Sequence, residues 1–140
     1  MQPKLSPKLI GAIVAALALA ACNESPPQQN QTTIKVRHAD QDRLFTLDAF
    51  NLAIGLKRAI YDAGYTCKRV TDAGFVGTWQ NLDMWTAHCV YDKGQPVDWA
   101  IFAGPDGSAQ VRNCADITPG SGLPECKITK RPKGSFTDVK

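Results

Sequence analysis

Five cysteines limit the folds that are open to this chain of 140 residues. Four of them, Cys67, Cys89, Cys114 and Cys126, fall within sixty residues of one another and are enough for two disulfides. A domain of that size has a small hydrophobic core that contributes only a few kcal/mol net, so covalent staples are expected. The fifth, Cys22, stands apart from the other four and needs a separate explanation.

The segment before Cys22 has the organisation of an export signal. Two lysines supply a positive start, residues 9–19 form an apolar run, and Ala20 and Ala21 are small residues at a cleavage position. The run is too short for a mature transmembrane helix, which needs about 20 apolar residues. One interpretation is an ordinary signal peptide that is cut after Ala20, which would leave Cys22 as a spare thiol.

The residues Leu19-Ala20-Ala21-Cys22 resemble the lipobox of bacterial prolipoproteins, in which the signal peptidase cuts before a lipidated cysteine. The resemblance covers this segment only. It implies a signal peptide over residues 1–21 and covalent lipid on Cys22. We expect no cofactor besides this lipid. Each buried methylene contributes about 0.8 kcal/mol, so several acyl chains would hold the protein to a membrane. Acylation would also consume the odd thiol and leave four cysteines for an oxidising periplasm.

The residue after the lipobox bears on location, and the charge of the mature chain bears on partners. In lipoproteins of this kind, an Asp directly after the cysteine favours retention in the inner membrane. Asn23 therefore implies the outer membrane, on the side that faces the periplasm. Removal of residues 1–21 takes away two lysines and no acid, so the net charge falls from +3 to +1. Such a chain has no general attraction for nucleic acid, and no nucleic-acid partner is expected.

Composition divides the mature chain into three parts. Residues 22–43 begin with polar, proline-containing sequence and are expected to be a lipidated, flexible tether. Residues 44–126 hold the hydrophobic patterns and four cysteines, and they predict one small domain. Residues 127–140 carry five basic residues against one acid and are expected to be a mobile tail. That tail is interpreted either as a solvated end or as a contact to acidic lipid headgroups or cell-wall polymer.

Residues 47–63 have the hydrophobic pattern of a single amphipathic helix. Thr46 is expected to cap its start, Asp48 lies at the positive end of the helix dipole, and Gly64 is expected to end it in a left-handed conformation. Only Lys57 interrupts the wide apolar arc, and we expect its stem to cover apolar surface while its amine reaches water. An arc this wide predicts packing against a sheet.

Turn residues divide the remainder into a four-stranded antiparallel meander, which makes the predicted fold class α+β. The strands are expected over residues 65–70, 83–91, 97–103 and 108–114. The first hairpin is expected to have a loop over residues 75–81. Pairing of residue 89 with 99 and of 101 with 111 would place ten apolar side chains on the face under the helix. They are Trp85, Ala87, Cys89, Tyr91, Val97, Trp99, Ile101, Ala103, Ala109 and Val111.

The same hairpins favour one disulfide pairing among the three that four cysteines allow. A first hairpin centred near Thr78 brings Cys67 opposite Cys89, and a Cys114–Cys126 bridge closes the loop that follows the last strand. Each bridge is expected to contribute about 3 kcal/mol through loop entropy, less any strain. The sequence has no Cys-x-x-Cys pair, so both bridges are predicted to be structural.

The sequence holds no recognisable catalytic motif. Its two histidines, His38 and His88, do not have the spacing of metal ligands, and there is no Gly-x-Ser-x-Gly elbow or phosphate loop. The acidic residues are scattered singly. We therefore predict no catalytic residues, no metal site and a protein that is not an enzyme.

The sheet face away from the helix is the predicted binding surface, because a single helix covers only one face. Its cross-strand rows are expected to be Thr86, Phe102 and Gln110, and then His88, Ala100 and Arg112. Aromatic, His and Arg side chains together suit a protein partner or an acidic ligand, and an ordinary solvated face is the alternative. Trp79, in the first hairpin loop, is expected to be exposed and to be the best single contact residue.

The leading hypothesis is a non-catalytic, membrane-anchored envelope lipoprotein that docks a periplasmic or outer-membrane protein. The first alternative is a periplasmic inhibitor domain whose Trp79 loop enters an enzyme cleft. The second is a small hydrolase or a carrier of a small ligand. The expected architecture resembles small envelope accessory domains and periplasmic inhibitor domains, which is a likeness of fold alone.

Overall fold

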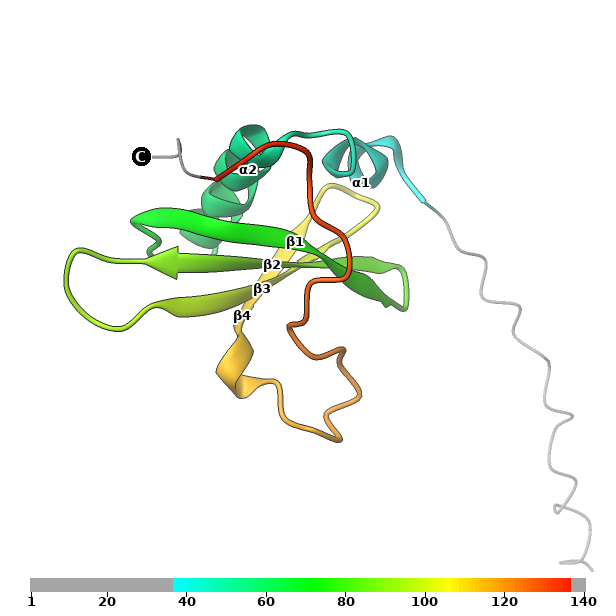
Figure 1. Cartoon of the computed structure of the whole chain (residues 1–140). Helices are drawn as coiled ribbons and strands as arrows, with labels where there is room; N and C mark the ends of the chain where they lie inside the picture. Colours follow the sequence, from blue (N-terminus) through cyan, green and yellow to red (C-terminus); the bar gives the residue numbers. More distant parts are fainter. Residues whose placement is uncertain (1–36, 137–140) are drawn as a thin grey trace, which may run out of the picture. The chain divides into compact units, whose positions relative to one another are not determined.

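Residues 37–136 are described by a computed structural model, and they form the helices and strands shown in Figure 1. The elements in chain order are α1 (Ala39–Leu44), α2 (Ala49–Asp62), β1 (Arg69–Trp79), β2 (Leu82–Val90), β3 (Val97–Ala103), β4 (Ala109–Asn113) and the 3-10 helix η1 (Cys114–Asp116). In this part of the chain, neither α-helix has the length and hydrophobicity needed to cross a membrane. The predicted lipidation site Cys22 lies outside the described residues.

Helix α2 is the predicted amphipathic helix, and it begins two residues later than expected. Asp48 caps it by accepting a hydrogen bond from the backbone N–H of Asn51 at 2.8 Å. The hydroxyl of Thr46, the predicted cap, instead donates to the carbonyl oxygen of Arg43 at the end of α1. Asp48 is the better cap because its charged oxygen also lies at the positive end of the helix dipole. Gly64 follows the helix with φ of +85°, which confirms the left-handed stop.

The four strands form one antiparallel sheet in the order β1-β2-β3-β4, which confirms the α+β meander. Helix α2 lies over one face of this sheet (Figure 1). Leu52, Leu56 and Ile60 of α2 pack in one buried cluster with residues of the predicted inner face, among them Trp85 and Ile101. The prediction of which sheet face lies under the helix is therefore confirmed.

The register between β2 and β3 differs from the prediction by two residues. Cys89 lies opposite Val97 rather than opposite residue 99, while Ile101 lies opposite Val111 as predicted. The β2–β3 connection is centred on Lys93 rather than on Gly94, which accounts for the shift. A shift of two leaves every side chain on its predicted face, because side chains alternate with a period of two. It changes which residues are cross-strand neighbours.

The first hairpin has longer strands and a shorter turn than expected. The predicted loop over residues 75–81 is wrong, since β1 continues to Trp79 and turns through Gln80 and Asn81 only, with Gln80 at φ of +55°. Two β-bulges interrupt the pairing of β1, one of them between Phe75 and Gly77. A glycine inside a strand often marks such a bulge, so Gly77 belongs to the strand and not to a loop.

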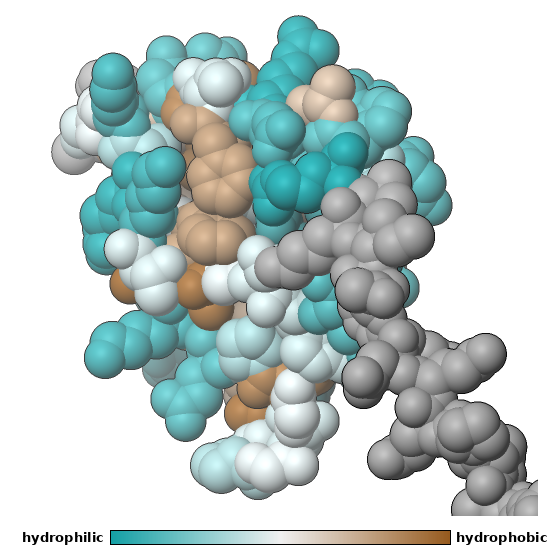
Figure 2. Space-filling model, turned by 90° about the vertical axis from the view of Figure 1, so that its right-hand side faces the viewer, coloured by the Kyte–Doolittle hydropathy of each residue, from teal (hydrophilic) through white to brown (hydrophobic). Residues whose placement is uncertain are grey.

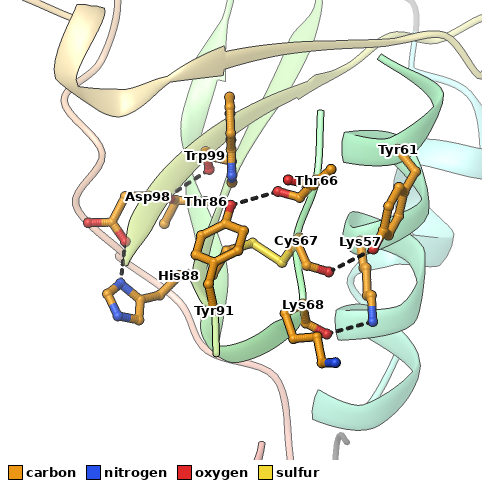
Figure 3. The surroundings of a disulfide bond; sticks show 11 residues. Lys57, Tyr61, Thr66, Cys67, Lys68, Thr86, His88, Tyr91, Asp98 and Trp99 are labelled. Atoms are coloured by element: carbon orange, nitrogen blue, oxygen red, sulfur yellow. Dashed lines mark hydrogen bonds and ion pairs between the residues drawn. A yellow bond between two sulfur atoms is a disulfide. The ribbon is translucent and has the colours of Figure 1, made fainter. Parts of the chain in front are cut away.

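Both predicted disulfides are present, Cys67–Cys89 and Cys114–Cys126, with Cα–Cα distances of 5.4 and 5.9 Å. Figure 3 shows the first, which joins the segment before β1 to β2. Around it, the hydroxyl of Tyr91 donates to the Thr66 carbonyl oxygen at 2.6 Å, as the figure also shows. From α2, the hydroxyl of Tyr61 and the amine of Lys57 donate to the carbonyl oxygens of residues 67 and 68. The bridge and these hydrogen bonds fix the end of the helix to the sheet.

Part of the second face of the sheet is covered, which corrects the prediction of an open face. Val76, Met84, Ala100 and Phe102 form a second buried cluster on this side. Partly buried hydrophobic side chains from the C-terminal part of the chain pack against it, namely Cys114, Ile117, Leu123 and Cys126. The loop closed by the second disulfide therefore covers this cluster, as α2 covers the other face of the sheet.

The folded part begins before the predicted boundary at residue 44. Gln41 of α1 is buried, and its side-chain amide donates to the carbonyl oxygens of Asn81 and Ala103 at 2.9 and 3.0 Å. Arg37 binds the fully buried carboxylate of Asp83 at 2.9 Å. Side-chain hydrogen bonds raise the pKa of the Arg37 guanidinium above its ordinary value, and the bond to Asp42 has a larger effect than the bond to Asp83. Residues 37–43 thus belong to the domain and not to the tether.

The C-terminal segment is also part of the fold as far as residue 136, so the prediction of a mobile tail is wrong for residues 127–136. The backbone of Phe75 in β1 exchanges hydrogen bonds with Thr129 and Lys130, at 2.8 to 3.2 Å. Further on, the Lys133 carbonyl oxygen accepts from the N–H of Ala49 at the start of α2. The tail was predicted from its basic composition. Composition does not indicate backbone hydrogen bonds of this kind, so the prediction was wrong for these residues.

Gly74 allows the C-terminal segment to approach β1 closely. A Cβ atom at this position would lie 2.5 Å from a methyl carbon of Ile128 and 2.7 Å from the Lys130 carbonyl oxygen. We expect Gly74→Ala to lower the free energy of unfolding by about 1–3 kcal/mol, because backbone must move to accept the methyl group. Urea unfolding measures this. Gly55→Ala is the matched control, since Gly55 lies in α2 with open space around it and should gain about 0.5–1 kcal/mol. Equal effects of the two would contradict the close approach.

Candidate functional site

Two of the predicted binding residues are buried and cannot contact a partner. Thr86 and Phe102 are only 5% and 3% exposed. The Thr86 hydroxyl donates to the Trp99 carbonyl oxygen at 3.1 Å, and Phe102 belongs to the second core cluster. Their side chains do point away from α2 as predicted, but the disulfide-closed loop covers them.

Trp79 is not the exposed contact residue that its predicted place in a loop suggested. It ends β1, is half-buried, and packs edge-on against Phe102 with ring centroids 6.2 Å apart. The large hydrophobic side chains with the greatest exposure are instead Phe50, Ile54 and Tyr61 of α2, at 47–49%, and Tyr65, at 43%. An inhibitor mechanism in which Trp79 enters a cleft therefore loses its structural argument.

His88 and Arg112 are separated by the corrected register. His88 lies opposite Asp98, and its Nδ1 is 2.5 Å from the Asp98 carboxylate, an interaction drawn in Figure 3. Arg112 lies opposite Ala100, in the row of Thr86. His88 is thus occupied within its own sheet. The Arg112 side chain is exposed and forms no hydrogen bond or ion pair with any side chain described here.

Arg112 lines an open groove beside β4, with a volume of about 530 Å³. The groove lies between this strand and the segment that follows α2. It is lined by Tyr65, Trp99, Gln110, Val111, Arg112, Asn113 and Asp116. Four of these are consecutive residues of β4, whose side chains alternate between the two faces of the sheet. The groove therefore follows the edge of the sheet and not one of its faces.

The apolar wall of the groove is an aromatic pair. The ring of Tyr65 lies 4.5 Å from that of Trp99, with 32° between the planes. Trp99 is 8% exposed and belongs to the core, whereas Tyr65 is 43% exposed. The indole N–H of Trp99 has no hydrogen-bond acceptor in the described part of the chain. A buried aromatic ring thus supports an exposed one, which gives a rigid apolar surface of the kind found at binding hot spots.

Polar side chains form the rim of the groove. Gln110, Arg112 and Asp116 have no side-chain partner among residues 37–136. Asn113 accepts a hydrogen bond from the Ala115 N–H at 2.9 Å, where it caps η1, and so retains its amide N–H groups for other contacts. A guanidinium, a carboxylate and two amides can therefore bind polar groups of a ligand around an apolar centre.

A second apolar depression lies where α1 meets β1 and the C-terminal segment. Phe45, Phe75 and Trp85 pack together there, with centroid distances of 4.8–5.5 Å, and Arg37 and Lys130 lie over the Phe45 ring. Figure 2 views the domain from the side of α1 and shows exposed hydrophobic side chains in a narrow column between hydrophilic ones. The depression has room for about one water molecule, roughly 10 Å³, so it offers no space for a ligand.

Groups of three or more His, Cys, Asp or Glu side chains that could hold a metal ion are not found within residues 37–136. In comparisons with known proteins, the chain matches no family model, no curated protein and no solved structure. The groove beside β4 is therefore taken as the candidate site on its own geometry. Two of its lining residues, Gln110 and Arg112, belong to the binding surface predicted from the sequence. The sequence pattern assigns Trp99 to the core and Tyr65 to the start of the first strand, and the position of Tyr65 directly after Gly64 was the signal that could have placed it in this groove.

Proposed function

We propose that this chain is a membrane-anchored lipoprotein of the bacterial cell envelope that docks a partner protein and is not an enzyme. The docking site is the groove beside β4. Leu19-Ala20-Ala21-Cys22 supports lipidation at Cys22, and Asn23 supports the outer membrane facing the periplasm. The two disulfides support an oxidising compartment, since stable bridges of this kind are rare in the cytosol.

The observation that carries the proposal is the unpaired Arg112 beside the Tyr65–Trp99 pair. Arg, Tyr and Trp are the residues most enriched where a few side chains supply most of the binding energy of an interface. An arginine on a protein surface usually has solvent as its partner, but this one lines an open groove with an aromatic wall. The groove has a volume of about 530 Å³, which is room for side chains of a partner, and its rim can bind polar groups next to them.

Site-specific photo-crosslinking in the envelope tests the proposal. A photoreactive amino acid at position 112 of the full chain is expected to crosslink to one envelope protein, which mass spectrometry identifies. Position 69 is the control, because Arg69 is exposed on β1, the strand at the other edge of the sheet. The same adducts from both positions, or none from position 112, would contradict docking at the groove.

Charge reversal gives a quantitative check on the same partner. Arg112→Glu is expected to weaken binding of the crosslinked partner by tenfold or more, about 1.5–3 kcal/mol, because a charge-assisted hydrogen bond is lost and a repulsion is introduced. Arg69→Glu should leave the affinity unchanged. Both side chains are exposed, so the melting temperatures of the two variants are expected to match the parent protein. Equal affinities for the two variants would contradict the proposed role of Arg112.

A further inference from the structure

We propose that the partner is recognised as an extended segment that adds a fifth strand to the sheet beside β4. This inference rests on the docking function proposed above and names the chemistry of the partner. The segment would be about five residues long, the length of β4, with apolar side chains toward Tyr65 and an acidic side chain facing Arg112. Strand addition of this kind supplies affinity through main-chain hydrogen bonds and specificity through alternate side chains.

The two edges of the sheet differ in whether another segment of the chain pairs with them. On β1, the chain's own C-terminal segment takes an edge position, where Phe75 donates to the Lys130 carbonyl oxygen at 2.9 Å and accepts from Thr129 at 2.8 Å. Strand β4 pairs with β3 and with no other segment among residues 37–136. An uncovered edge is a template for another strand, and proteins normally guard such edges. The segment that pairs at Phe75 on one edge and the open groove on the other mark β4 as the place for an added strand.

The backbone of β4 presents its free groups into the groove. Gly104 donates to the Ser108 carbonyl oxygen at 2.8 Å, so residues 104 and 108 form a hydrogen-bonded pair of the β3–β4 ladder. Hydrogen-bonded pairs alternate along an antiparallel ladder, which makes Phe102–Gln110 and Ala100–Arg112 the next ones. The N–H and C=O of Val111 therefore point away from β3, toward the open edge. A segment lying in the groove would pair with Val111.

The side chains beside that edge differ between the two faces of the sheet. Val111 packs against the core on the α2 side, the side on which Tyr65 and Trp99 form the aromatic wall. Gln110 and Arg112 project from the other side, because alternate residues of a strand face opposite ways. An added strand would place every second side chain against the aromatic wall. Those between would lie next to Gln110 and Arg112, at the 4.5–5.5 Å typical of cross-strand neighbours.

The charge of Arg112 indicates that the expected segment carries an acidic residue. The guanidinium of Arg112 is unpaired, and the carboxylate of Asp116 lies further along, in η1 beyond the end of β4. A glutamate opposite Arg112 would form a charge-assisted hydrogen bond, whereas a lysine there would be repelled. The sequence pattern that fits is apolar–acidic–apolar with β-branched residues, which favour an extended conformation.

A capped heptapeptide of sequence TTVEVTT is the probe, tested on the full chain in detergent micelles by NMR. We expect binding to slow hydrogen exchange of the Val111 amide by at least about tenfold. The changes should be smaller for the backbone amides of Gln110 and Arg112, which already form hydrogen bonds with β3. The peptide TTVKVTT should bind about tenfold more weakly, and Arg112→Glu should reverse this preference. Arg69→Glu is the matched control and should leave the preference as it is.

Several outcomes would overturn strand addition. They are a failure of TTVEVTT to bind, binding without protection of Val111, or an unchanged preference in Arg112→Glu. A soluble β-1,4-linked sugar oligomer that shifts the Tyr65 and Trp99 signals, while the peptide leaves Val111 unprotected, would assign the groove to glycans instead. If position 112 still crosslinks to an envelope protein in any of these cases, docking stands and only the strand-addition mode fails.

Discussion

Replacement of both Cys67 and Cys89 by alanine is expected to lower the free energy of unfolding by about 3 kcal/mol or more. The bridge spans 22 residues of sequence, and its loss restores that loop's freedom to the unfolded chain. Both cysteines are fully buried in the main core, so the change also removes sulfur atoms from packed surroundings. For a domain of this size, the melting temperature should fall by roughly 15 °C.

Thermal unfolding of the oxidised protein, followed by circular dichroism, measures this loss. The matched control is the double alanine variant of Cys114 and Cys126, whose bridge spans 12 residues. Its cysteines are half-buried and lie against the smaller cluster, so we expect a smaller fall in melting temperature. A change of only a few degrees in the Cys67 and Cys89 variant would show that the hydrogen bonds of α2 to residues 67 and 68, with that of Tyr91 to Thr66, hold this region without the bridge.

The disulfide pairing could be predicted from the sequence even though the first hairpin could not. The prediction placed the hairpin centre near Thr78 and set Cys67 in a strand opposite Cys89. The turn is in fact at Gln80 and Asn81, and it is Val70 that lies opposite Cys89. Cys67 still reaches Cys89 because it precedes the strand by two residues and the segment stays beside β2. Bulges depend on local packing and have only weak sequence signals, so the exact register was beyond the sequence.

The covered second face carried a signal that the prediction did not use. Residues 97–103 are apolar except for Asp98, and residues 84–87 include only one polar side chain, Thr86. A strand buried on both faces has such a continuous apolar run, whereas a half-exposed strand alternates. Reading the run as alternating assigned Phe102 to solvent. What lay beyond the sequence was the identity of the cover, because the loop from Cys114 to Cys126 has few large apolar residues.

The candidate groove could be predicted only in part, for a similar reason. Arg112 was found because strand alternation places it away from the helix. The sequence pattern predicts Tyr65 as the start of a strand, but Tyr65 lies in the connection between Gly64 and β1 and packs on Trp99. Contacts between a connecting segment and a distant strand depend on how the helix crosses the sheet, which hydrophobic periodicity does not specify.

Replacement of Cys22 by alanine is expected to release the protein from the membrane or leave an uncleaved precursor, with complete loss of lipid labelling. The proposed anchor is several acyl chains on one residue, and each buried methylene contributes about 0.8 kcal/mol, so the parent protein should be bound almost irreversibly. Labelling with a clickable palmitate analogue, followed by separation of membrane and soluble fractions, measures both effects. The double alanine variant of Cys114 and Cys126 is the control that must keep the label.

Mass spectrometry of the parent protein decides between the two possible cleavage sites before Cys22. The proposal requires a mature N-terminus at an acylated Cys22, whereas an ordinary signal peptide cut after Ala20 would leave a free Ala21. The second result would leave a thiol outside the described domain and remove the reason for a membrane location. It would leave the groove and the two disulfides as they are, because every residue that forms them lies between positions 65 and 126. The anchor and the docking site can therefore fail separately, and each needs its own test.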